Sequence, residues 1–226
     1  SVAVKQFEGR EIPYARIKPG QLQQDEHEAV ARTLLRGTER LPLAIEYSRN
    51  ITIGGIRKAI NKAREKLRER GATLDVVVID HLGLVASPAH KSAHRTQQVT
   101  EISNMLFGLA QSENVAMVAL CQLNRDSEKS EETRPGLHHL RDSGALEQDA
   151  STVLFPWRPA YKIVRNAAAL ESLPPDQYAD YKTTRFTMEI NVAKMRNGGT
   201  GVTTLHADMP NNLITDPTEN THGIAA

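Results

Sequence analysis

The chain has 226 residues, of which 39% are hydrophobic, enough to bury the core of one large α/β domain or two small ones; we expect one. Its 28 Lys and Arg nearly balance 27 Asp and Glu, which gives a net charge of +1. The chain as a whole is therefore not basic enough to attract nucleic acid, and any such contact must be local. Aromatic residues make up only 4%, which argues against extensive base-stacking platforms. A single cysteine excludes an intramolecular disulfide and is typical of a reducing compartment.

The beginning of the chain predicts neither secretion nor a membrane anchor. The first residues (SVAVKQFEGR) lack the basic start and apolar core of a signal peptide, and nowhere do eighteen apolar residues follow one another. We therefore expect a cytoplasmic protein without membrane contact. Residues 2–7 resemble an element already under way before Pro13 and Pro19 break it, so we expect further sequence upstream in the natural gene.

Two helices are predicted in the first third of the chain. Asp25 and Glu28 have the spacing of a capping box, and Gly37 is a typical helix stop. After a short strand expected at residues 43–47, apolar residues at helical spacing run from Ile56 to Leu67, and residues 57–70 contain seven Lys and Arg. The basic face of this second helix is interpreted as an ordinary solvated surface rather than as a functional patch.

Two apolar runs form the predicted centre of the sheet. They are LDVVVIDHLGLV at residues 74–85 and VAMVALCQLNR at residues 115–125, and a helical stripe at residues 99–110 connects them. Each run predicts a strand buried on both faces of a parallel sheet, as one βαβ unit.

Polar residues end both predicted strands. Asp80 follows the first strand, and Gln122 and Asn124 follow the second. Open α/β sheets bind ligands at the carboxyl ends of their strands, so a nucleotide site is the first hypothesis. An acid there suits Mg²⁺ coordination, and a glutamine could contact a γ-phosphate. Taken alone, Asp80 is more simply interpreted as a turn residue.

The second half of the chain alternates loops with short elements. We expect exposed loops at residues 86–96 and 126–135, and a short helix at residues 146–149. Residues 152–155 predict a third strand in the same sheet. The remaining expected segments are a surface insertion at residues 158–184, a hairpin whose strands include residues 186–192 and 202–205, and a tail over the last residues.

Several motifs, in one order, resemble the carboxyl-terminal motor domain of the DnaB-type replicative helicases. They are VVVIDHL, VTEISNMLFGLAQSENVAMVALCQLNR, RPGLHHLRDSGALEQDASTVLF and VAKMRNGGTG. The resemblance is specific from about residue 74 to residue 214 and looser before that. It implies a RecA-like P-loop NTPase core of the α/β class, a mostly parallel sheet flanked by helices with a carboxyl-terminal antiparallel hairpin.

The resemblance also implies an organisation for the chain as one partial motor domain. A helical lead-in is expected at residues 1–73, a sheet core at 74–157 and a surface insertion at 158–184. A hairpin follows at residues 185–215, and residues 216–226 form the tail.

Roles at the nucleotide site follow from the same resemblance. Asp80 matches the Walker B acid that holds the Mg²⁺ of ATP, and Gln122 matches the sensor of an S-Q-L-N-R motif, in which Cys121 replaces the usual Ser. Cys121 is otherwise a small buried hydrophobe, with no ligand spacing for zinc. Lys194 and Arg196 match a K-x-R-x-G pattern that enters the neighbouring subunit's ATP site. Their alternate spacing predicts that both lie on one face of the strand end.

The implied DNA-binding loop contains Arg141, Asp142 and Gly144, with Asp142 in place of the family's usual Glu. Arginine supplies charge-assisted bonds to phosphate, and glycine lets the backbone amide approach closely. The acidic residues from Glu147 to Asp149 are expected to order this loop rather than to touch DNA. His138 and His139 are interpreted as loop residues.

One family feature is absent from the sequence. No G-x-x-x-x-G-K-S/T loop occurs in the 226 residues, and we expect it upstream of residue 1, together with the segment carrying the catalytic glutamate. We therefore expect a fragment, inactive as an ATPase alone, of a homo-hexameric helicase that uses ATP and Mg²⁺ on single-stranded DNA, with a primase and a helicase loader as further partners. The alternatives are a non-catalytic remnant acting as a DNA-binding or assembly module, and a RecA-like ATPase without unwinding.

Overall fold

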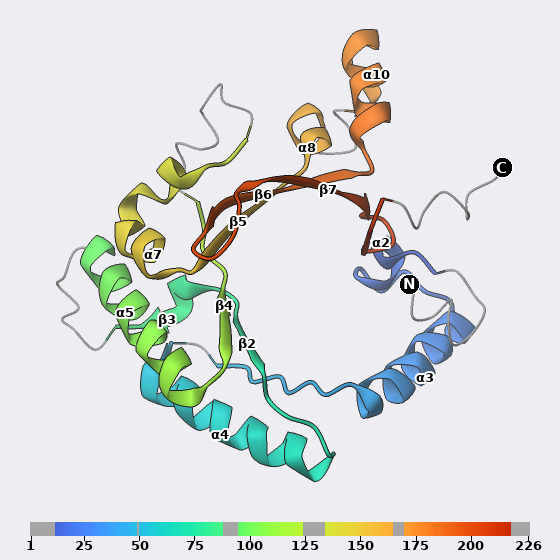
Figure 1. Ribbon diagram of the computed structural model, residues 1–226. Coiled ribbons are helices and arrows are strands. Elements are labelled where there is room, and N and C mark those ends of the chain that lie inside the picture. The colour runs from blue at the N-terminus through green and yellow to red at the C-terminus, as the bar shows by residue number, and fades with distance from the viewer. Residues whose placement is uncertain (1–11, 49, 88–94, 124–133, 165–169, 218–226) are drawn as a thin grey trace. The chain divides into compact units, whose positions relative to one another are not determined.

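The computed structural model describes residues 12–48, 50–87, 95–123, 134–164 and 170–217 (Figure 1). The chain divides into two compact units. The central unit is Pro42–Val153, and the terminal unit combines Ser1–Leu41 with Leu154–Ala226. In the described ranges, every helix is too short or too polar to cross a membrane. Parts of the expected loops at residues 86–96 and 126–135, and Asn124, lie outside the described residues.

A parallel pair of strands is the centre of the central unit. Strand β2 (Val76–Ile79) pairs with β4 (Ala116–Ala119) so that Ile79 lies opposite Ala119. The pairing continues past the strand ends, because the Leu120 amide donates to the Ile79 carbonyl at 3.0 Å. Helix α5 (Arg95–Glu113) connects the two strands, as the apolar runs predict.

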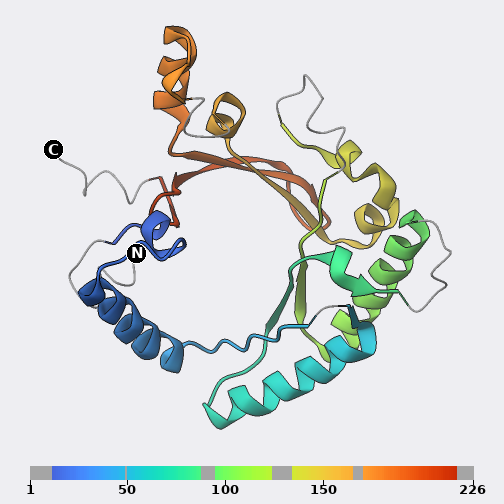
Figure 2. The same ribbon diagram turned by 180° about the vertical axis from the view of Figure 1, so that it is seen from behind.

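Helices α4 (Ile53–Glu69) and α5 cover the same face of this pair (Figures 1 and 2). The Thr52 hydroxyl accepts a hydrogen bond from the Gly55 amide at 3.1 Å and caps the start of α4. Between the helices and the strands lies the main core. Its buried members are Ile56, Ile60, Leu82, Val85, Ile102, Leu106 and Leu109, with Val77, Ile79 and Met117 packed against them.

The opposite face of the pair is exposed, so the prediction of strands buried on both faces is wrong. Val76 is 52% exposed, Val78 61% and Val118 49%. Neighbouring residues of a strand point to opposite faces, and both helices lie on the side of Val77 and Met117. A continuous apolar run shows that both faces of a strand could be buried. Whether they are buried depends on a second layer of helices, which the run itself does not encode.

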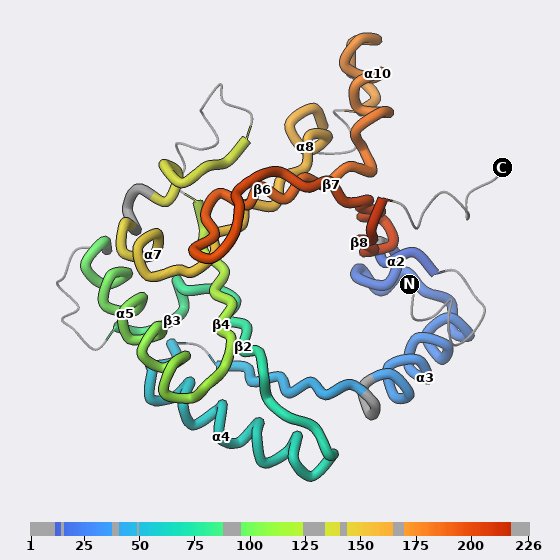
Figure 3. Tube along the Cα trace, in the orientation of Figure 1, coloured from blue at the N-terminus to red at the C-terminus, as the bar shows by residue number. Residues whose placement is uncertain are grey.

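The strand expected at residues 43–47 is also absent, because residues 42–48 are not in a strand (Figure 3 traces their course into α4). Ile45 is 84% exposed and Tyr47 81%. The nearby pairing is instead between β1 (Ile51–Thr52) and β3 (Val85–Ala86), which run parallel. Apolar composition favours a strand, but a strand forms only where its backbone pairs with another edge.

Three short helical segments complete the central unit. A 3₁₀ turn, η1 (Leu82–Leu84), follows β2. A longer 3₁₀ segment, η2 (Leu137–Ser143), leads directly into α7 (Gly144–Asp149), and both contact α5. Helix α7 confirms the helix predicted at residues 146–149.

The terminal unit contains a four-stranded sheet in the order β5-β6-β7-β8. Strands β6 (Thr187–Met195) and β7 (Gly201–Asp208) form the predicted antiparallel hairpin. Strand β8 (Leu213–Thr215) pairs antiparallel with β7 and extends the sheet.

Strand β5 (Thr152–Trp157) is bonded to β6, so the prediction that it joins the central sheet is wrong. A short apolar run predicts a strand, but its partner depends on which free edge the chain reaches. The predicted insertion contains α8 (Pro159–Ile163) and α10 (Pro175–Thr184), which contact each other.

The first helices of the chain differ in detail from the prediction. Helix α2 (Tyr14–Ile17) precedes α3 (Gln24–Arg40), which continues through Gly37. The start of α3 is capped by Glu26, not by the pair Asp25 and Glu28, because its carboxylate accepts from the Gln23 amide at 2.9 Å. Arg16 donates to the same carboxylate at 2.7 and 2.9 Å. These two contacts lower the pKa of Glu26, the backbone hydrogen bond most strongly.

Candidate nucleotide and DNA site

Asp80 and Gln122 lie at the same edge of the β2–β4 pair. Asp80 directly follows β2, and Gln122 comes three residues after β4, so the parallel register brings both to the carboxyl end. Both side chains are exposed, and the peptide bond between Asp80 and His81 is cis. Cys121 is exposed as well, so its prediction as a buried hydrophobe is wrong, because the residue lies beyond the end of β4, where the chain leaves the strand pair. The edge thus presents a carboxylate and an amide to solvent.

A cavity of about 550 Å³ in the central unit touches Asp80 but not Gln122. Most of its lining is apolar and comes from α4, β2 and residues 43–48, with three cationic side chains among them. The cations are Lys62, Lys66 and Arg70. Because Gln122 does not line it, this cavity is not the place where a ligand would meet both polar residues.

The carboxyl edge fits a metal ion that is only partly held by protein. Among the described residues, no three His, Cys, Asp or Glu side chains form a group able to hold a metal. Mg²⁺ is commonly bound through one or two carboxylates, with waters and phosphate oxygens completing its shell. The exposed Asp80 carboxylate meets that requirement, whereas a site built from protein ligands alone is not formed there.

The predicted DNA-binding loop crosses from η2 into α7. Arg141 and Asp142 have 3₁₀ backbone, and their side chains lie outside the described part of the structure. Gly144 is exposed, and a Cβ atom added there would meet nothing within 4 Å. The chain itself therefore does not require glycine at this position, and the space beside it is open to an incoming backbone.

His139 corrects the interpretation of this segment. The residue is buried, and its Nδ1 atom accepts a hydrogen bond from the Gly136 amide at 2.9 Å. The ring of His138 lies 3.9 Å from that of His139. His139 thus fixes the start of η2, and no sequence signal distinguishes it from His138, because both follow one loop.

Lys194 and Arg196 belong to the terminal unit. Lys194 is half-buried and lies within β6. Arg196 is exposed and is the first residue after the strand, which ends at Met195. The alternate spacing predicts that both residues lie on one face at the end of the strand, but only Lys194 belongs to the strand. Arg196 occupies the turn that leads to β7.

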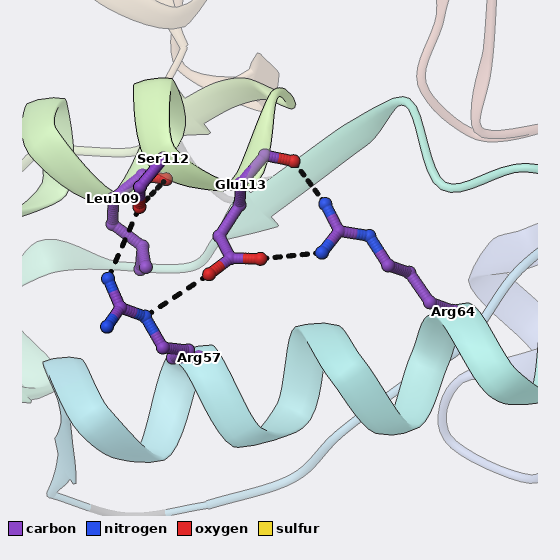
Figure 4. A network of polar contacts seen from close by, with 5 residues as sticks. All are labelled: Arg57, Arg64, Leu109, Ser112 and Glu113. Atoms are coloured by element: carbon purple, nitrogen blue, oxygen red, sulfur yellow. Dashed lines mark hydrogen bonds and ion pairs between the residues drawn. The ribbon is translucent and has the colours of Figure 1, made fainter.

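Part of the basic face of α4 is used inside the protein (Figure 4). Arg64 binds the Glu113 carboxylate of α5 at 2.5 Å and also donates to the Glu113 carbonyl. Arg57 contacts the same carboxylate at 3.2 Å and donates to the Ser112 hydroxyl at 3.2 Å. The sequence gives no sign of this network, because about fifty residues separate its partners. The network supports a structural rather than a functional interpretation of the basic face of α4.

Comparison with known proteins identifies the family. Residues 6–212 match the model of the DnaB-like helicase C terminal domain. The chain belongs to this family. Among its relatives are a probable replicative DNA helicase of Trieres chinensis, 34% identical over 77% of the chain, and the replicative DNA helicase DnaB of Haemophilus influenzae, 32% identical over 84%.

Solved structures agree on a RecA-like fold. One, described as an ATPase domain, superimposes with a TM-score of 0.71 and 25% identity over 91% of this chain and 66% of its own. Another, a DnaB-like replicative helicase described with its interactions with primase, gives a TM-score of 0.69 at 25% identity over 90% of this chain and 45% of its own. The chain spans 35% and 36% of the length of the two relatives named above.

Proposed function

We propose that the chain forms part of the motor of an ATP-dependent replicative DNA helicase, and that both units belong to one motor domain. The family match supports this, because it extends across both units. The observation that carries the proposal is the position of Asp80 and Gln122, a carboxylate and an amide at one edge of a parallel pair. Nucleotides bind at this edge in open α/β sheets.

At this edge, Asp80 would hold the Mg²⁺ that accompanies ATP, and Gln122 would contact the γ-phosphate. The ion neutralises charge on the transferred phosphoryl group, which is the main requirement of phosphoryl transfer. Lys194 and Arg196 would act on the ATP of a neighbouring subunit in a homo-hexamer. The turn position of Arg196 suits such a reach, because its exposed side chain is not confined to the strand face.

The 226-residue chain by itself is proposed to be inactive as an ATPase. It contains no G-x-x-x-x-G-K-S/T sequence, whose backbone amides and lysine hold the phosphates in this fold class. Asp80 and Gln122 alone offer too few phosphate contacts for tight binding. In the cytoplasm, the complete motor would work with a primase and a helicase loader, and a solved relative is described with its primase interactions.

Single-stranded DNA is the proposed substrate of the segment Arg141 to Gly144. The segment begins in 3₁₀ backbone and ends at an exposed glycine with open space beside it, so amides there can approach a phosphate. Contacts directed at the DNA backbone need no strongly basic chain, which is consistent with a net charge of +1.

Binding of an oligo-dT strand to the purified chain tests this proposal. Arg141→Ala should weaken binding about tenfold and reduce the slope of affinity against salt, because one phosphate contact is lost. Lys58→Ala is the matched control, since Lys58 is an exposed cation on the outer face of α4. Equal losses in the two variants, or no loss in Arg141→Ala, would show that the loop does not bind DNA.

A further inference from the structure

The loop from Leu140 to Gly144 is held from its amino-terminal side by buried side chains. Leu140 is 8% exposed and His139 6%. The hydrogen bond from the Gly136 amide to His139 fixes the first turn of η2. This side of the loop is therefore anchored by packing and by a cap.

The carboxyl-terminal side depends on α7, which has six residues. A helix of this length has no stability of its own in water, so its position is set by its contacts. Two contacts with neighbouring elements stand out. Leu146 packs against the main core, and the Ser103 hydroxyl of α5 donates to the Asp149 carboxylate at 2.6 Å.

Ser103, the partner of Asp149 on α5, is a polar residue among buried apolar ones. Ser103 is 5% exposed, and Ile102 beside it and Leu106 one turn later are also buried. An alanine would fit such a position without the cost of removing a hydroxyl from water. A hydrogen bond to the partly buried Asp149 carboxylate offsets that cost, so the pair adds little net stability while it fixes the distance between the two helices.

We propose that Ser103 and Asp149 are positioning residues for the DNA-binding loop. Their bond holds the carboxyl end of α7 against α5, so that Gly144, at the other end of the same helix, and the backbone that leads to it from η2 are held in one position. Asp149 itself does not bind DNA, because its carboxylate is engaged by Ser103 and would repel phosphate. This inference rests on the proposed function of the loop.

The test compares Ser103→Ala and Asp149→Asn with the unaltered chain. Both should bind oligo-dT about threefold to tenfold more weakly, and amide hydrogen exchange should accelerate in η2 and α7. Ser112→Ala is the matched control: Ser112 is on the same helix, donates to the Leu109 carbonyl at 3.1 Å and accepts from Arg57 at 3.2 Å, and neither partner belongs to η2 or α7. It should leave both measurements unchanged.

A double-mutant cycle separates positioning from a general loss of stability. In an Arg141→Ala background, Ser103→Ala should have little further effect on affinity, because the phosphate contact that depends on the position of the segment is already lost. Additive losses would overturn the proposal. So would unchanged affinity and exchange in the single variants while Arg141→Ala still weakens binding, and that result would leave the proposed function intact. If Arg141→Ala has no effect, the loop assignment and this inference both fall.

Discussion

Glu113→Ala should destabilise the central unit by about 1.5 kcal/mol. Its carboxylate is 13% exposed and receives Arg64 at 2.5 Å, and Arg64 is itself 37% exposed. A charge-assisted bond in such a partly buried place contributes about 1 kcal/mol net. The 3.2 Å contact with Arg57, which is 55% exposed, adds about 0.5 kcal/mol after screening by solvent. Alanine has a higher helix propensity than glutamate, so a loss of stability in this variant comes from the lost contacts and not from the helix itself.

Urea unfolding followed by far-ultraviolet circular dichroism measures this loss. The single tryptophan, Trp157, lies in the terminal unit, so its fluorescence reports on that unit, whereas circular dichroism reports on the helices of both units. Arg64→Ala should cost more than Arg57→Ala, because its contact is shorter and less exposed. Glu65→Ala, an exposed change on α4, should stay within about 0.5 kcal/mol of the unaltered chain. A loss below about 0.5 kcal/mol in Glu113→Ala, or the reverse order of the arginines, would refute the reasoning.

Two further predictions concern helix starts. Because the folded pKa of Glu26 lies below its ordinary value of 4.5, its contribution to stability is complete above that pH and is lost as the pH falls through the lowered pKa. Acid titration of Trp157 fluorescence should therefore show a smaller acid-induced loss of stability in Glu26→Gln than in Glu28→Gln, whose carboxylate is 59% exposed; identical titrations would contradict this. Thr52→Ala should destabilise the central unit by about 1 kcal/mol in urea unfolding, through the loss of the α4 cap, and an unchanged midpoint would contradict it.

Local patterns predicted most elements but not their partners. The helical stripe of α5 and the alternation in β6 are visible within short stretches of sequence, and the structure confirms the helix and the hairpin that they predict. The pairing of β5 with β6 and the exposed face of Val76 and Val78 depend on which elements reach a given edge or face. Propensity does not contain that information.

The candidate site shows the same division. Asp80 and Gln122 were predictable because a parallel register brings two strand ends to one edge once the strands are recognised. The bond between Ser103 and Asp149 was not, because it joins residues 46 positions apart through two packed helices. A serine within an apolar stripe gives no sign of the partner that it will meet.

The central claim is that the chain carries the magnesium and γ-phosphate half of an ATP site and needs a phosphate loop to complete it. Its most direct test is Mg²⁺-dependent ATP hydrolysis, measured for the chain alone and for the chain joined to the segment of a family relative that carries both the G-x-x-x-x-G-K-S/T loop and the catalytic glutamate. We predict no turnover by the chain alone, and turnover by the joined protein that Asp80→Asn abolishes. Turnover by the chain alone, or turnover that survives Asp80→Asn, would contradict the account.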